Sequence, residues 1–257
     1  MRPVLIQAAV PAELELLISA LEGARSDNAA VCPVTEGYLG DTLVACSAGG
    51  AGKANAAATA ATLVERHNPE MIIITGCGGA YPGSGLSVGD LAVASDELFG
   101  DEGVITVDGW QNLSDMGLAL HRQGSLSYFN SIPLSRHAAE KAMQLSESHG
   151  VRLVRGRFLT VSTCSGTRLR GIELARLNHA VCENMEGAAI ALVALRYGIP
   201  SLEIRGISNL VEDRDMSRWD IPAAVERCQR FLIKIIEELQ RTEQHNTVAG
   251  RSIPESA

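Results

Sequence analysis

Short apolar runs alternate along this chain with longer segments of helical periodicity, and this alternation restricts the fold more than any other feature. Buried strands are predicted over residues 4–9, 42–46, 71–75, 89–95, 157–162 and 201–207. Helices are predicted after Pro11, before Asn68, and over residues 135–149, 167–177, 186–197 and 221–240. The order predicts an α/β fold in three layers, with a central mixed, largely parallel twisted sheet flanked by helices.

The length and composition favour one domain. The chain has 257 residues, of which 46% are hydrophobic, and no linker-like break interrupts it. We therefore expect a single domain over residues 1–245 and a disordered tail over residues 246–257. Residues 96–134 follow no clear pattern, which fits either a functional loop or unrecognised strands.

The charge and the cysteines exclude several classes of protein. The net charge is -8 and the basic residues form no stripe, so no nucleic-acid partner is expected. No signal segment and no apolar run long enough to span a membrane is visible. The six cysteines form no Cys-x-x-Cys pair, which favours a cytoplasmic protein with reduced thiols. The histidines lack metal-ligand spacing, and neither a metal nor another cofactor is expected.

Two short runs carry the chemistry. The run 184–189 (NMEGAA) places a lone carboxylate at the start of an apolar helix, and the run 205–209 (RGISN) places an arginine and an amide at the end of an apolar strand. Strand ends and helix starts meet where open α/β sheets bind small molecules. The two runs therefore predict one small-molecule site.

Two glycine runs fail as nucleotide-binding motifs. The run 50–53 (GAGK) has Ser47 and Ala54 where a phosphate-binding loop requires glycine and Ser/Thr. The run 76–81 has Tyr81 where a dinucleotide fingerprint has its third glycine. Glycines that permit tight turns explain both runs equally well.

Taken in order, six segments resemble the purine nucleoside phosphorylase and nucleosidase superfamily, especially its methylthioadenosine/S-adenosylhomocysteine nucleosidases. They are 8–13 (AAVPAE), 50–53 (GAGK), 75–79 (TGCGG), 88–90 (VGD), 185–188 (MEGA) and 205–209 (RGISN). Three others resemble the futalosine hydrolase branch: 79–86 (GAYPGSGL), 100–104 (GDEGV) and 208–215 (SNLVEDRD). The resemblance implies a nucleoside phosphorylase-like fold. It also implies hydrolysis of futalosine to hypoxanthine and dehypoxanthine futalosine, in the alternative route to menaquinone.

The resemblance further implies catalytic roles for four residues. Glu186 would bind the ribose hydroxyls and stabilise the cation that forms, and Glu13 would deprotonate the attacking water. Arg205 would hold that water or orient Glu13. Asn209 stands where adenine-cleaving relatives have an aspartate; its amide can donate to O6 or N7 of a 6-oxopurine, which favours hypoxanthine. Ordinary structural roles compete at all four: a first-turn carboxylate, an exposed glutamate, an ion pair and a turn asparagine.

Other substrate contacts are expected from Cys77, Gly78, Gly79, Met185, Phe99, Thr163 and Gly166. Packing competes with function at Cys77, where the nucleosidases have a serine. Packing also competes at Phe99, Tyr128 and Phe129, which could stack on the base or on the aromatic arm of futalosine. The carboxylate of futalosine requires a cation, for which the sequence leaves Arg122, Arg136, Arg168 and Arg214 open.

Several alternative functions stay open. They are another purine nucleosidase, a 6-oxopurine nucleoside phosphorylase and a nucleoside-binding protein without catalysis. Phosphorolysis is disfavoured because the segments 13–25 and 76–90 contain Arg25 as their one cation, and a phosphate site needs several donors. Retention of both Glu13 and Glu186 disfavours the binding protein. The partners expected are a small nucleoside and, because the family's pockets are often completed by a neighbour, further copies of the chain in a homo-oligomer.

Overall fold

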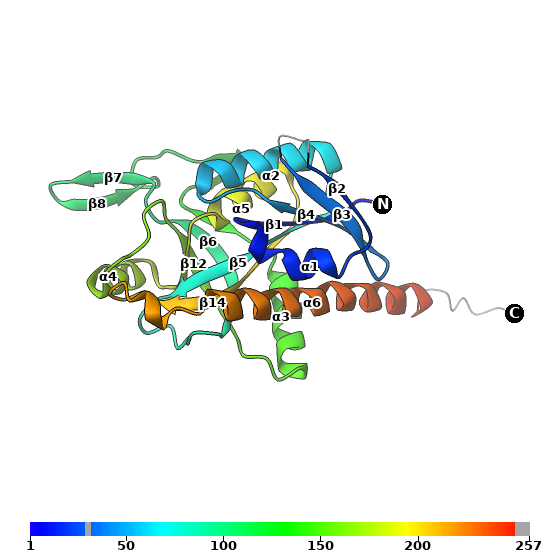
Figure 1. Cartoon of the computed structure of the whole chain (residues 1–257). Coiled ribbons are helices and arrows are strands. Elements are labelled where there is room, and N and C mark those ends of the chain that lie inside the picture. Colours follow the sequence, from blue (N-terminus) through cyan, green and yellow to red (C-terminus); the bar gives the residue numbers. More distant parts are fainter. Residues whose placement is uncertain (29–31, 250–257) are drawn as a thin grey trace, which may run out of the picture.

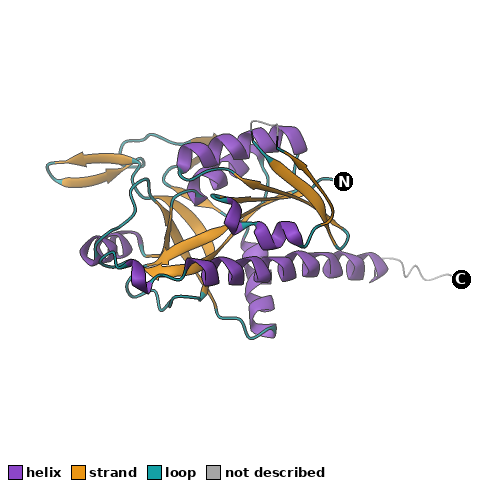
Figure 2. Ribbon diagram, in the orientation of Figure 1, coloured by secondary structure: helices purple, strands orange, loops and turns teal. Residues whose placement is uncertain are grey.

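The computed structural model describes residues 1–28 and 32–249, arranged as a central sheet between helices (Figure 2). The main sheet contains, within that part of the chain, ten strands. Its strands are β1 (Val4–Ala8), β2 (Glu22–Asp27), β3 (Val34–Leu39), β4 (Thr42–Ala48), β5 (Met71–Ala80), β6 (Leu91–Phe99), β11 (Ser131–Pro133), β12 (Leu153–Thr160), β13 (Ala180–Asn184) and β14 (Ser201–Leu210). Two separate two-stranded sheets consist of β7 (Gly103–Thr106) with β8 (Gly109–Asn112) and β9 (His121–Gln123) with β10 (Leu126–Tyr128). The helices are α1 (Glu15–Ser19), α2 (Lys53–His67), α3 (Arg136–Ser148), α4 (Arg168–Asn178), α5 (Gly187–Tyr197) and α6 (Ile221–Ala249), with 3₁₀ turns η1 (Pro11–Glu13) and η2 (Met216–Arg218).

Alternate residues of the strands bury against opposite helix layers. In β1, Val4 and Ile6 pack with α1, α3 and α6, whereas Leu5 packs with α2 and α5. Figure 1 shows α2 and α5 above the sheet and α1, α3 and α6 below it. Because side chains of a strand point alternately to its two faces, apolar runs such as 71–74 supply both layers. The predicted three-layer α/β fold is confirmed.

The sheet is mixed, and part of it closes on itself. Pairing is parallel along β4-β1-β5-β14 and along β6-β12-β13, and antiparallel at the remaining contacts. Since β14 pairs with both β5 and β6, and β13 pairs with β5, the strands β5, β14, β6, β12 and β13 form a closed ring. A closed ring leaves no free edge and holds the ends of its strands rigidly.

The structure differs from the sequence-based expectation in the N-terminal third and in two long segments. The helix expected after Pro11 is a 3₁₀ turn and the short α1, and β2 and β3 follow it. The strand predicted to end at residue 75 continues as β5 through the glycines to Ala80, because β14 pairs with it along that length. Of the two possibilities for residues 96–134, the structure shows the unrecognised strands. There β6 continues to Phe99, and the two hairpins β7–β8 and β9–β10 and the edge strand β11 follow.

The final helix is also longer than predicted. It ends at Ala249 instead of residue 240, so residues 246–249 of the expected tail are helical. Residues 250–257 lie outside the described part of the chain. Among the described residues, no helix is both long and apolar enough to cross a membrane.

Candidate active site

A cavity of about 320 Å³ lies where β1, β5, β13 and β14 end beside the start of α5. Its size suits a nucleoside-sized ligand. The cavity brings together most of the residues predicted from the sequence: Glu13, Cys77, Gly78, Gly79, Met185, Glu186, Arg205 and Asn209.

Glu186 is the N-cap residue immediately before α5, but its side chain makes no capping hydrogen bond. The side-chain oxygen of Asn184 accepts from the backbone N–H groups of Glu186 and Gly187, at 3.0 and 2.8 Å. Asn184 thereby satisfies helix N–H groups that a first-turn carboxylate would otherwise attract. The buried Glu186 carboxylate is left to accept from Gly52 N–H at 2.9 Å and to approach Arg205 Nη1 at 3.5 Å.

The glycine run 50–53 explains how a backbone N–H reaches that carboxylate. Gly50 and Gly52 have φ of +91° and +89°, which other residues rarely adopt. The chain can therefore turn sharply between β4 and α2 and present the Gly52 N–H to Glu186. The run is a turn that holds a carboxylate, and no phosphate-binding loop is needed to account for it.

Glu13 is buried and fully held by backbone donors. Its Oε1 accepts from Cys77 N at 2.9 Å, and its Oε2 accepts from Ala9 N at 3.0 Å and Val10 N at 3.2 Å. A Cβ at Gly76, whose φ is +140°, would lie 2.5 Å from Oε1, so only glycine leaves room for the carboxylate. Glu13 is therefore a built feature of the cavity wall, in contrast to the exposed glutamate that competed with it as an interpretation.

Arg205 is the buried cation of the cavity. It donates from Nε to Glu203 at 2.8 Å and from Nη1 to the Cys77 carbonyl at 3.1 Å. Burial opposes its charge, but the carboxylates of Glu203, Glu186 and Glu13 raise its pKa well above the usual range. Nη2 is buried without a hydrogen-bond partner, so a donor remains for a ligand or a water. Arg205 is thus both a structural ion pair and a group that lines the cavity.

A further buried carboxyl group lies next to Glu203. Glu97 is fully buried and accepts from Asn184 Nδ2 at 2.6 Å and from Thr160 Oγ1 at 2.7 Å. Burial, and then the adjacent carboxylate of Glu203, raise the pKa of Glu97 well above its usual range. These surroundings favour the protonated form of Glu97, which limits the repulsion among the buried carboxylates.

Asn209 lies near the end of β14, opposite Gly79 of β5. Its Oδ1 accepts from Ser208 Oγ at 2.9 Å, and its Nδ2 donates to the Leu210 carbonyl at 3.0 Å. These bonds fix the amide plane at the cavity wall. Since an amide nitrogen carries two hydrogens, one is left for a ligand.

Sequence reasoning missed Glu183 and Trp219, which line the cavity, and it left Arg214, which also lines it, as one of four candidate arginines. Glu183 accepts from Tyr81 Oη at 2.7 Å and from Ser165 Oγ at 2.6 Å, and it pairs with Gly79 on the opposite side from Asn209. A carboxylate inside an otherwise apolar strand was the available signal for Glu183. Trp219 lies in the turn after β14, for which the sequence held no comparable signal, whereas Arg214 lies in the segment 208–215 that the resemblance had already singled out.

Some predicted contacts do not reach the cavity. Phe99 is buried in the core, with Lys53 Nζ 5.6 Å from its ring centre. Thr163 and Gly166 do not line the cavity themselves; they flank Cys164 and Ser165, which do. Cys77 does line the cavity, but burial, and then Glu13, raise the pKa of its thiol to about 11. A thiol that stays neutral at physiological pH is a packing group and a poor nucleophile.

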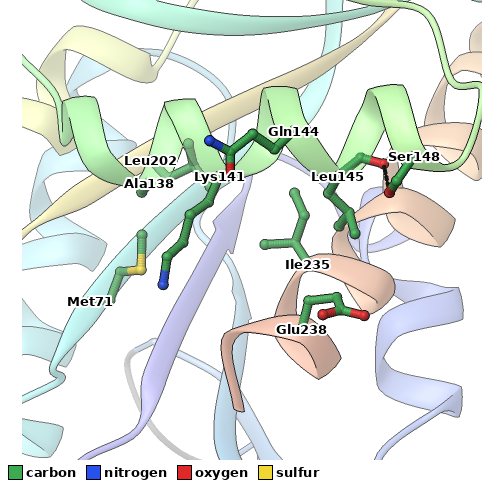
Figure 3. A pocket seen from close by; sticks show the side chains of 9 residues that line it. All are labelled: Met71, Ala138, Lys141, Gln144, Leu145, Ser148, Leu202, Ile235 and Glu238. Atoms are coloured by element: carbon green, nitrogen blue, oxygen red, sulfur yellow. Dashed lines mark hydrogen bonds between the residues drawn. The ribbon is translucent and has the colours of Figure 1, made fainter. Parts of the chain in front are cut away.

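A second hollow, of about 390 Å³, lies between α3 and α6 (Figure 3). Its wall includes Met71, Leu145, Leu202 and Ile235, and it contains none of the predicted site residues. The predicted site residues gather instead in the cavity at the strand ends. There the paired carboxylates of Glu13 and Glu186 can stabilise a developing cation and activate a water.

Known proteins provide an independent comparison. The family model described as "Phosphorylase superfamily" matches residues 3–241. A futalosine hydrolase of Acidothermus cellulolyticus is 34% identical over 88% of this chain and 86% of its own. A 5'-methylthioadenosine/S-adenosylhomocysteine nucleosidase of Bacillus thuringiensis is 28% identical over 90% of this chain and 97% of its own. The crystal structure of an S-adenosylhomocysteine nucleosidase from Streptococcus pyogenes in complex with 5-methylthiotubericidin superposes with a TM-score of 0.80 at 23% identity, over 93% of this chain and 97% of that one.

These comparisons agree with the family, the fold and the class of N-glycosyl hydrolases expected from the sequence motifs, and they confirm all three. The match runs through every element that forms the cavity, from β1 to most of α6. The chain belongs to the phosphorylase superfamily.

Proposed function

We propose that this protein hydrolyses the N-glycosidic bond of futalosine, releasing hypoxanthine and dehypoxanthine futalosine for menaquinone biosynthesis. The observation that carries the proposal is the Glu13 carboxylate, held in the cavity by three backbone N–H groups. A carboxylate fixed in this way can take a proton from a water that attacks the sugar.

The reaction builds positive charge on the ribose and negative charge on the departing purine. Glu186 lines the same cavity, and its carboxylate can accept from ribose hydroxyls while it stabilises the cation. The Nη2 group of Arg205 has no hydrogen-bond partner and can donate to the water or to Glu13. The charge of Arg205 also attracts the carboxylates of Glu13 and Glu186.

The charge around the cavity favours water over phosphate. Three carboxylates line it, those of Glu13, Glu183 and Glu186, and the buried cation Arg205 is already paired with Glu203. The N–H groups of Ala9, Val10 and Cys77, which could bind an anion, are occupied by Glu13. Arg214, in the turn after β14, is the lining cation that has no carboxylate partner among the described residues. A phosphate dianion next to Glu13 and Glu186 would meet repulsion from them, whereas a neutral water would not.

Two groups on either side of Gly79 favour a 6-oxopurine. Asn209 has a free amide hydrogen suited to O6 or N7, and Glu183 is an acceptor suited to the N1–H that adenine lacks. A relative at 34% identity named futalosine hydrolase supports the same choice. The methylthioadenosine nucleosidase is the second candidate, because a relative of that name matches over 90% of the chain.

A substrate panel separates these activities. Purified protein is incubated with futalosine, methylthioadenosine and inosine, with and without phosphate, and the released base is quantified. We expect hypoxanthine from futalosine at a rate that is independent of phosphate. A strict requirement for phosphate would reject hydrolysis, and adenine release from methylthioadenosine as the faster reaction would support the second candidate.

We also propose a homo-oligomer and a cytoplasmic location. Apolar side chains stand exposed on and beside the hairpins that follow β6, including Ile105 and Val107, which are 81% and 102% exposed. Exposed apolar groups of this kind mark surfaces that other protein covers. All six cysteines are free thiols, as a reducing compartment requires. Light scattering on the purified protein measures the oligomer, and a single-chain mass would reject it.

A further inference from the structure

Arg214 lines the cavity and is not engaged by any neighbouring carboxylate. Three acids flank it along the chain, and each has another partner. Glu212 pairs with Arg218 at 2.6 Å, Asp213 accepts from Arg168 N at 3.1 Å, and Asp215 accepts from Ser217 N at 3.0 Å. Among the described residues, the guanidinium of Arg214 takes part in no hydrogen bond or ion pair, so its N–H groups are available to a ligand.

An aromatic ring fixes the position of this cation. The central carbon of the Arg214 guanidinium lies 5.0 Å from the centre of the Trp219 ring, within the range of a cation–π contact. This contact uses none of the guanidinium N–H groups, which stay free for bidentate recognition of a carboxylate. The pair is therefore built to receive an anion at the cavity.

The wall near this pair is apolar. Val10 and Ala12 come from the turn after β1, and Ile221 and Val225 come from the start of α6, two residues after Trp219. Ala12, Ile221 and Val225 also adjoin one another outside the cavity, which places these two segments in contact. A ligand that suits this part of the cavity has an apolar body and an anionic end.

We propose that Arg214 binds a carboxylate at the far end of the 5′ substituent of the nucleoside, and that Trp219 packs against the apolar part of that substituent. The proposal rests on the proposed function, because futalosine carries a carboxylated aromatic arm at this position, whereas methylthioadenosine and inosine do not. Arg214 is then the residue that determines specificity for the acidic substrate.

The structure also separates Arg214 from the other arginines that the sequence left open. Arg122 donates to Ser127 Oγ in the β9–β10 hairpin, and Arg136 pairs with Glu140 on the surface of α3. Arg168 gives its backbone N–H to Asp213. Of these four arginines, Arg214 alone lines the cavity.

The test compares two substrates in two variants of the full chain. In Arg214→Gln, kcat/KM for futalosine should fall about 10- to 100-fold, mostly through KM, because the charge-assisted contact is remote from the bond that breaks. Cleavage of inosine, which lacks the carboxylate, should stay within about twofold of wild type. Arg136→Gln is the matched control, since Arg136 is exposed, pairs with Glu140 on α3 and does not line the cavity. It should leave both substrates unchanged.

A modified substrate provides a check that needs no variant. The methyl ester of futalosine should react with wild-type protein about as slowly as futalosine reacts with Arg214→Gln. Equal losses for futalosine and inosine in Arg214→Gln, or undiminished cleavage of the ester by wild type, would overturn the assignment of Arg214. Failure of the wild type to cleave futalosine at all would instead overturn the proposed function, which keeps the two failures distinct.

Discussion

Glu13 is the residue whose replacement tests the chemistry of the cavity most directly. Glu13→Gln keeps the volume of the side chain but turns one oxygen into an NH2 group, which cannot accept. The carboxylate now accepts from Cys77 N at 2.9 Å, Ala9 N at 3.0 Å and Val10 N at 3.2 Å. In the variant, at least one of these N–H groups faces another donor. A buried N–H left without an acceptor costs about 1–3 kcal/mol.

The expected result has two parts. The melting temperature should fall by about 2–4 °C for each kcal/mol lost in a chain of this size. The kcat for hypoxanthine release should fall about 100- to 10,000-fold, which is the usual contribution of a general base. Glu15→Gln is the matched control, because Glu15 is exposed, lies two residues further on and does not line the cavity. A folded Glu13→Gln protein with kcat within about threefold of wild type would refute the role of Glu13 as the base.

Three further predictions concern other buried groups. Glu186→Gln should lower kcat about 100- to 1,000-fold, because the charge opposite the ribose cation is lost; an unchanged kcat would exclude that role. The melting temperature should fall as well, because the amide oxygen can still accept from Gly52 N–H but the NH2 group then faces Arg205 Nη1. Asn209→Asp should lower the ratio of kcat/KM for futalosine to that for methylthioadenosine at least about tenfold, since an ionised carboxylate cannot donate to O6; a constant ratio would show that Asn209 does not contact the base. The raised pKa of Glu97 means that the folded protein binds a proton that the unfolded chain releases above pH of about 4.3, so wild-type stability should fall by about 1.4 kcal/mol per pH unit from there up to the folded-state pKa. Glu97→Gln cannot release that proton, so its free energy of unfolding in urea should rise relative to that of wild type between pH 5 and 8. Parallel pH curves for the two proteins would contradict a protonated Glu97.

The sequence was sufficient for the layers and for the location of the site. Apolar runs such as 71–74, and helices that end at Asn68 and Gly198, are local patterns that depend on neighbours in the chain, and the structure follows them. The runs 184–189 and 205–209 also predicted that Glu186 and Arg205 share one cavity, and they do. The edge strands were missed because β2 is exposed throughout, so its sequence lacks the apolar signal of a buried strand.

Tertiary structure alone decided how each of these groups is held and what remains free. That the Gly52 N–H binds Glu186, that the Cys77 N–H binds Glu13, and that Glu203 raises the pKa of Glu97 all depend on contacts between residues far apart in the chain. The same holds for Arg214, which became distinct from three other arginines only when the partners of its neighbouring acids were known. Residue type and periodicity determine which groups are available, whereas hydrogen-bond partners and burial, which set charge and reactivity, come from the packing of distant segments.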